Sequence, residues 1–164
     1  YLMGERCPWQ DPYARGVFLG LSVNSTKEDM LRAVFEGIAL NLYLIFKKIC
    51  KVEPISEINL IGGGSHGDVW PQMLADMFNV PVYKLASPGD GTGFGAAVIA
   101  GVALGIYKDY TVVSQFINRK KAYFPDEIRH DFYSYELDIF EQTYLALKPI
   151  FEEIQSPNAY RINV

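Results

Sequence analysis

A run of three glycines, Gly62, Gly63 and Gly64, gives this chain its best candidate for a ligand-binding turn. Glycine has no Cβ atom, so its backbone adopts positive φ angles and lets a ligand approach closely. If a helix follows, its unpaired amides and the positive end of its dipole favour an anion such as a phosphate. The turn could therefore hold one part of a nucleotide. A tight turn with a purely structural role is the alternative.

The residues on either side of the glycines predict a strand before the turn and a helix after it. Residues 58–61 form a short, mainly aliphatic run, and residues 69–78 carry apolar side chains at helical spacing. Open α/β sheets bind ligands at the carboxyl ends of their strands, which is where this turn lies. A second strand at residues 81–85 completes a strand–helix–strand unit, and we expect its two strands to be parallel neighbours.

Two known phosphate-binding motifs overlap the turn, and neither is complete. Gly62, Gly64 and Gly67 match G-x-G-x-x-G, but the next strand carries Lys84 and no carboxylate at its end to bind a ribose. A dinucleotide site of the Rossmann type is therefore disfavoured. The G-x-x-x-x-G-K-[ST] motif fails as well, because Asp68 stands where the lysine is required. The turn has no side chain that could reach the outer phosphates or magnesium.

The composition indicates an acidic globular domain. The 164 residues are 49% hydrophobic and carry a formal net charge of −4, with a pI near 5.2. This acidity argues against a nucleic-acid partner, and the basic cluster from Arg119 to Lys121 is interpreted as a surface loop. No apolar run reaches the roughly 18 residues of a membrane-spanning helix. We therefore expect no membrane association and a cytoplasmic location.

Side chains that could act as a nucleophile, a base or a metal ligand are few. Cys7 and Cys50 are distant in sequence and belong to no Cys/His cluster, so reduced thiols are expected. His66 and His130 lack partners at the spacing of metal ligands, and no Ser/His/Asp set is convincing. We therefore predict no metal site and no complete catalytic group in this chain.

Further elements are predicted before the glycine turn. Residues 17–21 read as a strand of the same sheet, and residues 27–51 as a long helix with apolar residues on most faces. Ser25 and Glu28 have the spacing of a capping box, which would start this helix.

The sequence after the second strand is rich in loops and ends in a helix. Residues 87–93 are predicted to be a loop, and a helix of small residues is expected to begin near Phe94. Residues 121–125 are interpreted as a connector. The last helix is expected from about residue 130 to 155, with Pro149 able to kink it.

Five segments along residues 1 to about 150 resemble the carboxyl-terminal half of carbohydrate kinases of the FGGY family. They are Gly4-Glu5-Arg6-x-Pro8, residues 14–21, residues 32–37, residues 60–76 and Gly95-Ala96-Ala97. Within the family, residues 60–64 and 72–76 look most like xylulokinases. Residues 15–18, 41–43 and 123–125 are also similar to gluconokinases.

The resemblance implies an α/β, actin-like ATPase (ribonuclease H-like) lobe, with a mixed sheet and helices on both faces. Family members transfer the γ-phosphate of Mg-ATP to a sugar hydroxyl. On this basis residues 1–164 are the carboxyl-terminal nucleotide-binding lobe, and the amino-terminal sugar-binding lobe is absent. The implied substrate is a pentulose such as D-xylulose, with gluconate as the alternative. A non-catalytic, actin-like nucleotide-binding module is the alternative from another class.

The resemblance also gives roles to particular residues. Gly62, Gly63 and Gly64, together with Ser65 and Asp68, match the motif that contacts adenosine and the inner phosphate. The catalytic aspartate and the phosphate loop of the family belong to segments upstream of this chain. We therefore expect the isolated chain to bind nucleotide weakly and to transfer no phosphate.

The amino-terminal segment matches a part of the family near the interdomain cleft. Gly4, Glu5 and Arg6 carry this match. Because a single lobe leaves its interdomain face uncovered, residues 1–9 are expected to expose an apolar patch made of Tyr1, Leu2, Met3 and Trp9. Such a patch favours self-association, so a homo-oligomer is expected.

Overall fold

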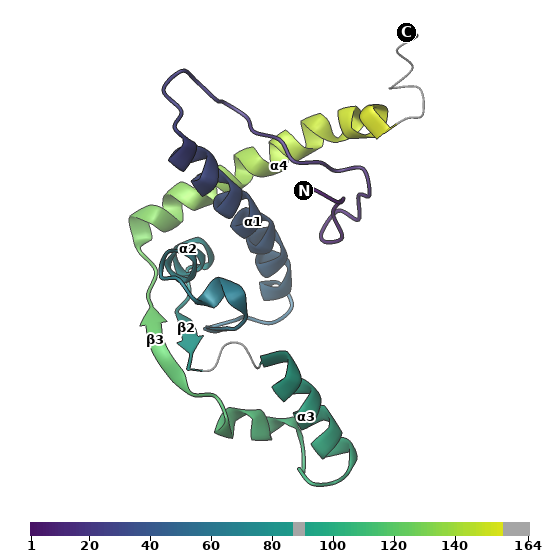
Figure 1. Ribbon diagram of the computed structural model, residues 1–164, viewed down its shortest axis with the longest axis vertical. Coiled ribbons are helices and arrows are strands. Elements are labelled where there is room, and N and C mark those ends of the chain that lie inside the picture. Colours follow the sequence, from purple (N-terminus) through teal and green to yellow (C-terminus); the bar gives the residue numbers. More distant parts are fainter. Residues whose placement is uncertain (87–90, 156–164) are drawn as a thin grey trace. The chain divides into compact units, whose positions relative to one another are not determined.

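The computed structural model describes residues 1–86 and 91–155. The chain forms two compact units, one made of Tyr1–Glu53 with Asp131–Val164 and the other of Pro54–His130. The first unit contains helix α1 (Lys27–Cys50) and most of helix α4 (Glu127–Gln155), and the second contains the sheet (Figure 1). Each helix in the described ranges is too short or too polar to span a bilayer.

The second unit is built on a three-stranded mixed sheet in the order β1, β2, β3. β1 (Ile58–Leu60) pairs in parallel with β2 (Val82–Leu85), and Ile58 lies opposite Val82. β2 pairs antiparallel with β3 (Arg119–Tyr123) (Figure 1). The parallel pair confirms the predicted strand–helix–strand unit, and the mixed sheet confirms the predicted α/β class.

Strand β3 shows that the prediction of a loop and connector between Arg119 and Pro125 was wrong. Its charged side chains find partners on neighbouring elements. The Arg119 guanidinium forms an ion pair with Glu57 and lies 3.9 Å from the centre of the Tyr83 ring. Lysine is depleted in strands, and the partners of these charged side chains are distant in the sequence. The local sequence pattern therefore did not reveal the strand.

Helix α2 (Val69–Phe78) follows the glycine turn and packs against β2 and β3. Its bounds are those predicted. Seven of its ten residues are buried, and they include Met73, Leu74 and Met77 of the predicted apolar stripe. The helix ends at Asn79, which has the left-handed φ of 55° that asparagine tolerates at a helix end.

A buried aspartate, Asp76, connects α2 to the start of α4 (Glu127–Gln155). Its carboxylate accepts hydrogen bonds from Gln72 Nε2 at 2.8 Å and from the Asp126 amide at 3.0 Å. The Arg129 guanidinium lies 3.4 Å away. Asp126 in turn accepts a hydrogen bond from the Arg129 amide, so it caps α4. One carboxylate therefore fixes the junction between β3 and α4.

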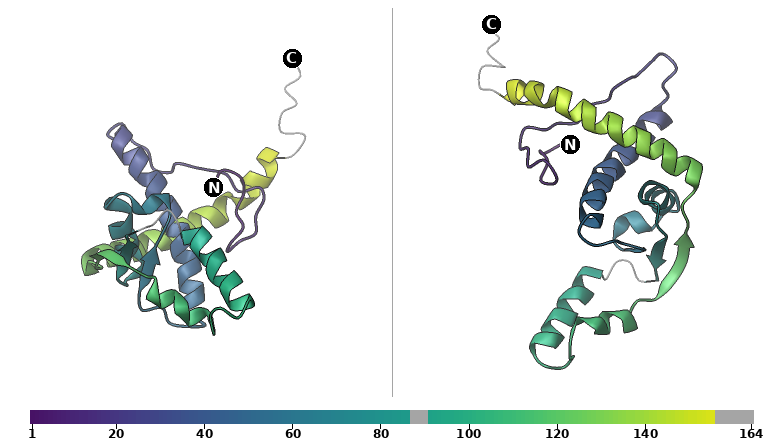
Figure 2. Two further views of the ribbon diagram at one scale, coloured as in Figure 1. Left: turned by 60° about the horizontal axis from the view of Figure 1, so that its bottom comes forward. Right: turned by 180° about the vertical axis from the view of Figure 1, so that it is seen from behind.

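Helix α3 (Gly91–Ala103) and the 3-10 helix η3 (Tyr110–Gln115) complete the second unit (Figure 2). The rings of Phe94 and Phe116 meet edge to face, with centroids 5.0 Å apart. Helix α3 begins three residues earlier than predicted. Residues 87–90 of the predicted loop lie outside the described residues.

The helices of the first unit contact each other through a small polar network. On α1 (Lys27–Cys50), Arg32 forms an ion pair with Glu36 at 2.8 Å. The Tyr133 hydroxyl, on α4, donates to Glu36 at 3.0 Å and accepts from Arg32 at 3.1 Å. Tyr133 thereby links this ion pair of α1 to α4. Helix α4 begins earlier than predicted and continues through Pro149.

The capping box of α1 lies one residue further along the chain than predicted. Thr26 is the N-cap, and its side chain and that of Asp29 each accept a hydrogen bond from the other residue's amide. Ser25 is used in the preceding turn, where its Oγ accepts from the Ser22 amide at 2.9 Å. The predicted pairing of Ser25 with Glu28 was therefore wrong.

The amino-terminal residues differ most from prediction. Residues 17–21 form no strand, and no strand in the described part of the chain pairs with them. The prediction that they share the sheet with β1 and β2 was therefore wrong. Tyr1 and Trp9 pack on α4, where the Trp9 ring stacks on Tyr144 at 4.7 Å, so neither belongs to an exposed patch. Leu2 and Met3 do remain exposed, at 85% and 96%.

Candidate functional site

The three glycines differ in backbone conformation and in what surrounds them. Gly62 has a φ of 85° and a ψ of −177°, and Gly63 then begins the short 3-10 helix η1 (Gly63–Ser65). A Cβ atom on Gly63 would meet nothing within 4 Å, whereas one on Gly64 would lie 3.2 Å from the Trp70 ring. The positive φ of Gly62 thus makes the turn possible, and the backbone at Gly63 is open to a ligand. The absence of a side chain at Gly64 leaves space for the Trp70 ring.

Ser65 holds the turn together from inside. The residue is fully buried, and its Oγ donates a hydrogen bond to the Gly62 carbonyl at 2.7 Å. The Ser65 amide donates to the same carbonyl at 3.1 Å. Its hydroxyl is therefore engaged within the turn, so any effect of Ser65 on a ligand acts through the shape of the backbone.

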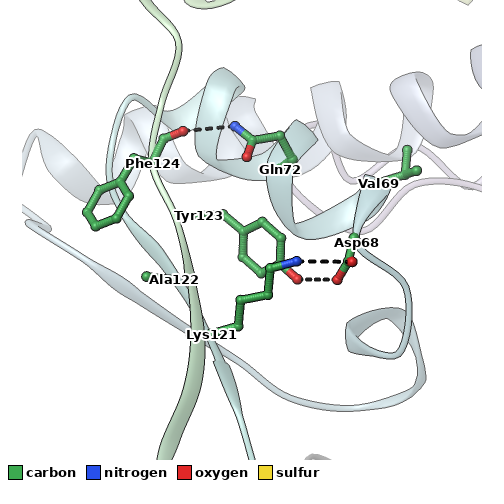
Figure 3. Close-up of a pocket in the computed structure, with 7 residues that line it drawn as sticks. All are labelled: Asp68, Val69, Gln72, Lys121, Ala122, Tyr123 and Phe124. Carbon is green, nitrogen blue, oxygen red and sulfur yellow. Dashed lines mark hydrogen bonds and ion pairs between the residues drawn. The ribbon is translucent and has the colours of Figure 1, made fainter.

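Asp68 precedes α2 but does not cap it with its side chain. Its carboxylate instead meets donors from the sheet (Figure 3). The Tyr123 hydroxyl donates to Oδ1, and Lys121 Nζ lies 3.0 Å from Oδ2. Lys84 Nζ lies 3.8 Å from Oδ1 and donates to the His66 carbonyl at 2.9 Å. Asp68 is thereby fixed in place, while its side chain remains 64% exposed.

These contacts define the charge of each group. The hydrogen bond from Tyr123, followed by that from Lys121, lowers the pKa of Asp68 below its usual range. Burial, followed by the hydrogen bond to Asp68, raises the pKa of Tyr123, and the Asp68 carboxylate raises the pKa of Lys121. At neutral pH the cluster therefore consists of a carboxylate, a neutral phenol and an ammonium group.

An open pocket of about 580 Å³ lies beside this cluster (Figure 3). Its lining comes from the start of α2 and from β3 with the residue that follows it: Asp68, Val69, Gln72, Lys121, Ala122, Tyr123 and Phe124. Asp68 was predicted from the sequence, whereas the β3 residues of the pocket were not. The alternation of Lys121 and Tyr123 at a spacing of two residues was the signal that could have revealed it.

The predicted cleft residues lie in the first unit, where two of them have structural roles. Gly4 has a φ of 82°, and a Cβ atom there would lie 2.9 Å from the Pro12 backbone. Glu5 is 7% exposed, and its carboxylate accepts hydrogen bonds from three amides, including that of Trp9 at 2.7 Å. Arg6 is exposed and forms no hydrogen bond or ion pair with the described residues.

Other reactive side chains form no evident site in the described ranges. No group of three or more His, Cys, Asp or Glu residues there could hold a metal ion. Cys7 and Cys50 are free thiols. The His130 ring lies 3.0 Å from the Asp76 carbonyl oxygen, so it is part of the α2–α4 junction.

Comparison with known proteins identifies a family that this chain matches. Residues 1–104 match the C-terminal domain of the FGGY family of carbohydrate kinases. The chain is 35% identical over 156 residues to a xylulose kinase of Staphylococcus epidermidis, covering 94% of this chain and 31% of that protein. It is 33% identical over 156 residues to a gluconokinase of Bacillus licheniformis, covering 94% of this chain and 30% of that protein.

Solved structures agree with the sequence matches. The crystal structure of gluconate kinase from Lactobacillus acidophilus superposes with a TM-score of 0.82 at 34% identity, over 94% of this chain and 31% of that one. The chain therefore spans about a third of the length of each of these relatives.

Proposed function

Because the chain belongs to the FGGY family of carbohydrate kinases, we propose that it is the nucleotide-binding lobe of a kinase that transfers a phosphoryl group from ATP to a sugar. The observation that carries the proposal is the glycine turn at the carboxyl end of β1. There Gly63 is open to a ligand, and Asp68 presents a fixed, exposed carboxylate. A turn in this position is where α/β sheets bind ligands.

The turn suits the adenosine and inner phosphate of ATP. Gly63 permits close approach to the backbone, and the amides at the start of α2 favour a negative group. Asp68 can accept a hydrogen bond from a hydroxyl or amino group of the nucleoside. ATP, when bound, supplies the phosphoryl group that is transferred.

In the ranges that the structure describes, we assign no residue to the outer phosphates of ATP or to Mg²⁺. Lys84 already donates a hydrogen bond to the His66 carbonyl and lies 3.8 Å from Asp68 Oδ1. The described residues hold no cluster of acidic groups for a metal ion. Phosphoryl transfer needs metal-bound phosphates and a base in line with the acceptor. We therefore expect this lobe to bind and orient the nucleotide and to transfer no phosphate alone.

We propose a pentulose such as D-xylulose as the sugar, with gluconate as the second candidate. Relatives named for each substrate resemble the chain about equally, at 35% and 33% identity. The test is an assay of ADP release by the full-length natural protein with a panel of pentuloses and aldonic acids. Faster turnover of D-xylulose than of gluconate supports D-xylulose as the substrate, and the reverse order supports gluconate.

Nucleotide binding can be tested on the chain itself. We expect calorimetry with ADP and Mg²⁺ to detect weak binding, and Gly63→Val to weaken it by about tenfold or more, because the new side chain blocks the backbone. Gly63 is a better position than Gly64, where a larger side chain would also disturb Trp70.

Gly37→Val is the matched control, because a Cβ atom on this α1 residue also meets nothing within 4 Å. It should leave ADP affinity unchanged. Absence of ADP binding by the unaltered chain, or equal affinity in the Gly63→Val variant, would overturn the proposed site.

A further inference from the structure

We propose that Tyr123 and Lys121 of β3 are positioning residues, which hold the Asp68 carboxylate so that it accepts a hydrogen bond from the nucleoside part of the bound nucleotide. The inference rests on the proposed function and extends the site to a strand that is far away in sequence. It gives β3 a role in ligand binding in addition to its role in the sheet.

The exposure of Asp68 makes such support necessary. Its side chain is 64% exposed and makes no hydrogen bond to the helix that it precedes. An exposed carboxylate without partners samples several rotamers, and fixing one of them on binding costs entropy. Two donors on β3 select one orientation before the ligand arrives (Figure 3).

Tyr123 is a rigid donor. The residue is only 5% exposed, and it lies opposite Val82 in the β2–β3 pairing. Its ring is held by the sheet, so its hydroxyl reaches Asp68 Oδ1 from a fixed position. A hydrogen bond to an ionised acceptor is stronger than one between neutral groups.

Lys121 adds a second, electrostatic reason for the arrangement. Lys121 lies directly opposite Lys84 across the β2–β3 pair. Like charges in such a position destabilise a sheet. Here the Asp68 carboxylate lies between them, 3.0 Å from Lys121 Nζ and 3.8 Å from Lys84 Nζ. The lysines and the aspartate therefore stabilise one another.

The carboxylate retains room for a ligand after these contacts. An ionised carboxylate has about four lone-pair positions. Tyr123 occupies one on Oδ1 and Lys121 one on Oδ2, and the 3.8 Å contact with Lys84 is an ion pair without a hydrogen bond. Asp68 also lines the pocket, so the remaining lone pairs are accessible.

The first experiment measures ADP affinity by calorimetry at one fixed salt concentration. Tyr123→Phe and Lys121→Met should each weaken binding by about three- to tenfold, because the carboxylate loses its fixed orientation. Lys121→Arg keeps the charge and a donor, so it should restore most of the affinity. Lys120→Met is the matched control, since Lys120 is an exposed neighbour on the same strand and should have no effect.

A double-mutant cycle separates positioning from a general structural role. If Tyr123 acts through Asp68, Tyr123→Phe should have no further effect on ADP affinity in an Asp68→Ala background. Additive losses, or unchanged affinity in both β3 variants, would overturn the inference while leaving the proposed function intact. Tighter binding in these variants would overturn it as well, since the contacts would then compete with the ligand. Failure of the unaltered chain to bind ADP overturns both proposals.

Melting temperatures of all variants complete the test. Lys121 has a half-exposed side chain, so its variants should fold even if Tyr123→Phe does not. If ADP affinity falls in proportion to the melting temperature in every variant, including Lys120→Met, the losses reflect general destabilisation. That result would contradict a positioning role for Tyr123 and Lys121. Losses confined to Tyr123→Phe and Lys121→Met at unchanged folded fraction would support it.

Discussion

At the scale of single residues, each of the three glycines has a different structural role. Gly62 supplies the positive φ, Gly63 the open backbone and Gly64 the space beside Trp70. The sequence predicted a glycine turn at a strand end, and that prediction is confirmed. It did not distinguish the three residues, because backbone angles and the position of the indole ring depend on how η1 and α2 pack.

Gly62 should be the glycine on which stability depends. Its φ of 85° with a ψ of −177° lies in a region that only glycine occupies readily. Gly62→Ala should therefore lower the free energy of unfolding by roughly 1–3 kcal/mol, as measured by urea denaturation. Gly63→Ala, with an ordinary φ and open space, should change it little. Equal losses in both variants would contradict the distinct roles assigned to these glycines.

At the scale of elements, the sequence predicted best where a pattern is local. The helices α1 and α2 and the strands β1 and β2 were each predicted close to their observed bounds, because apolar spacing and flanking turn residues define them. The strand β3 was missed because its charged side chains are stabilised by Glu57 and Asp68, some 60 and 50 positions away along the chain. For the same reason, only part of the candidate site was predicted: the glycine turn and Asp68, but not the residues of β3.

The strand predicted at residues 17–21 illustrates the opposite error. Its run of β-branched, aromatic and aliphatic residues has strand character, yet these apolar side chains are exposed, including Leu19 at 69%. A strand is defined by hydrogen bonds to a neighbour, and the described residues provide none at this place. A local pattern can indicate the preference of a segment but not its partner.

The junction between α2 and α4 should depend on Asp76. Asp76→Ala removes the buried acceptor shared by Gln72, the Asp126 amide and Arg129, so three contacts at the junction of α2 with the start of α4 are lost together. We expect a loss of roughly 2–4 kcal/mol in the free energy of unfolding, measured by urea denaturation. Faster hydrogen exchange at the start of α4 should accompany it.

Asp131→Ala is a suitable control for this prediction, because Asp131 is exposed near the start of the same helix. Its substitution should change the free energy of unfolding by less than about 0.5 kcal/mol. A loss of similar size in the two variants would show that Asp76 does not hold the junction.

At the scale of the whole molecule, the fold is that of the actin-like ATPase lobe of FGGY sugar kinases, as the sequence predicted. The division into two compact units was not predicted, because it depends on contacts between the amino-terminal segment and α4. Tyr1, Trp9 and Tyr144 make these contacts through their rings. The expected apolar patch is reduced accordingly to Leu2 and Met3, which weakens the case for self-association through this segment.

The glycine turn and the β3 pocket are together proposed to bind a nucleotide. The most direct test is a titration of the isotopically labelled chain with ADP and Mg²⁺, followed by the NMR shifts of its backbone amides. The largest shifts should occur at residues 62–68 and 121–124, with little change along the exposed face of α1. Shifts confined to other segments, or none at saturating ADP, would contradict the account.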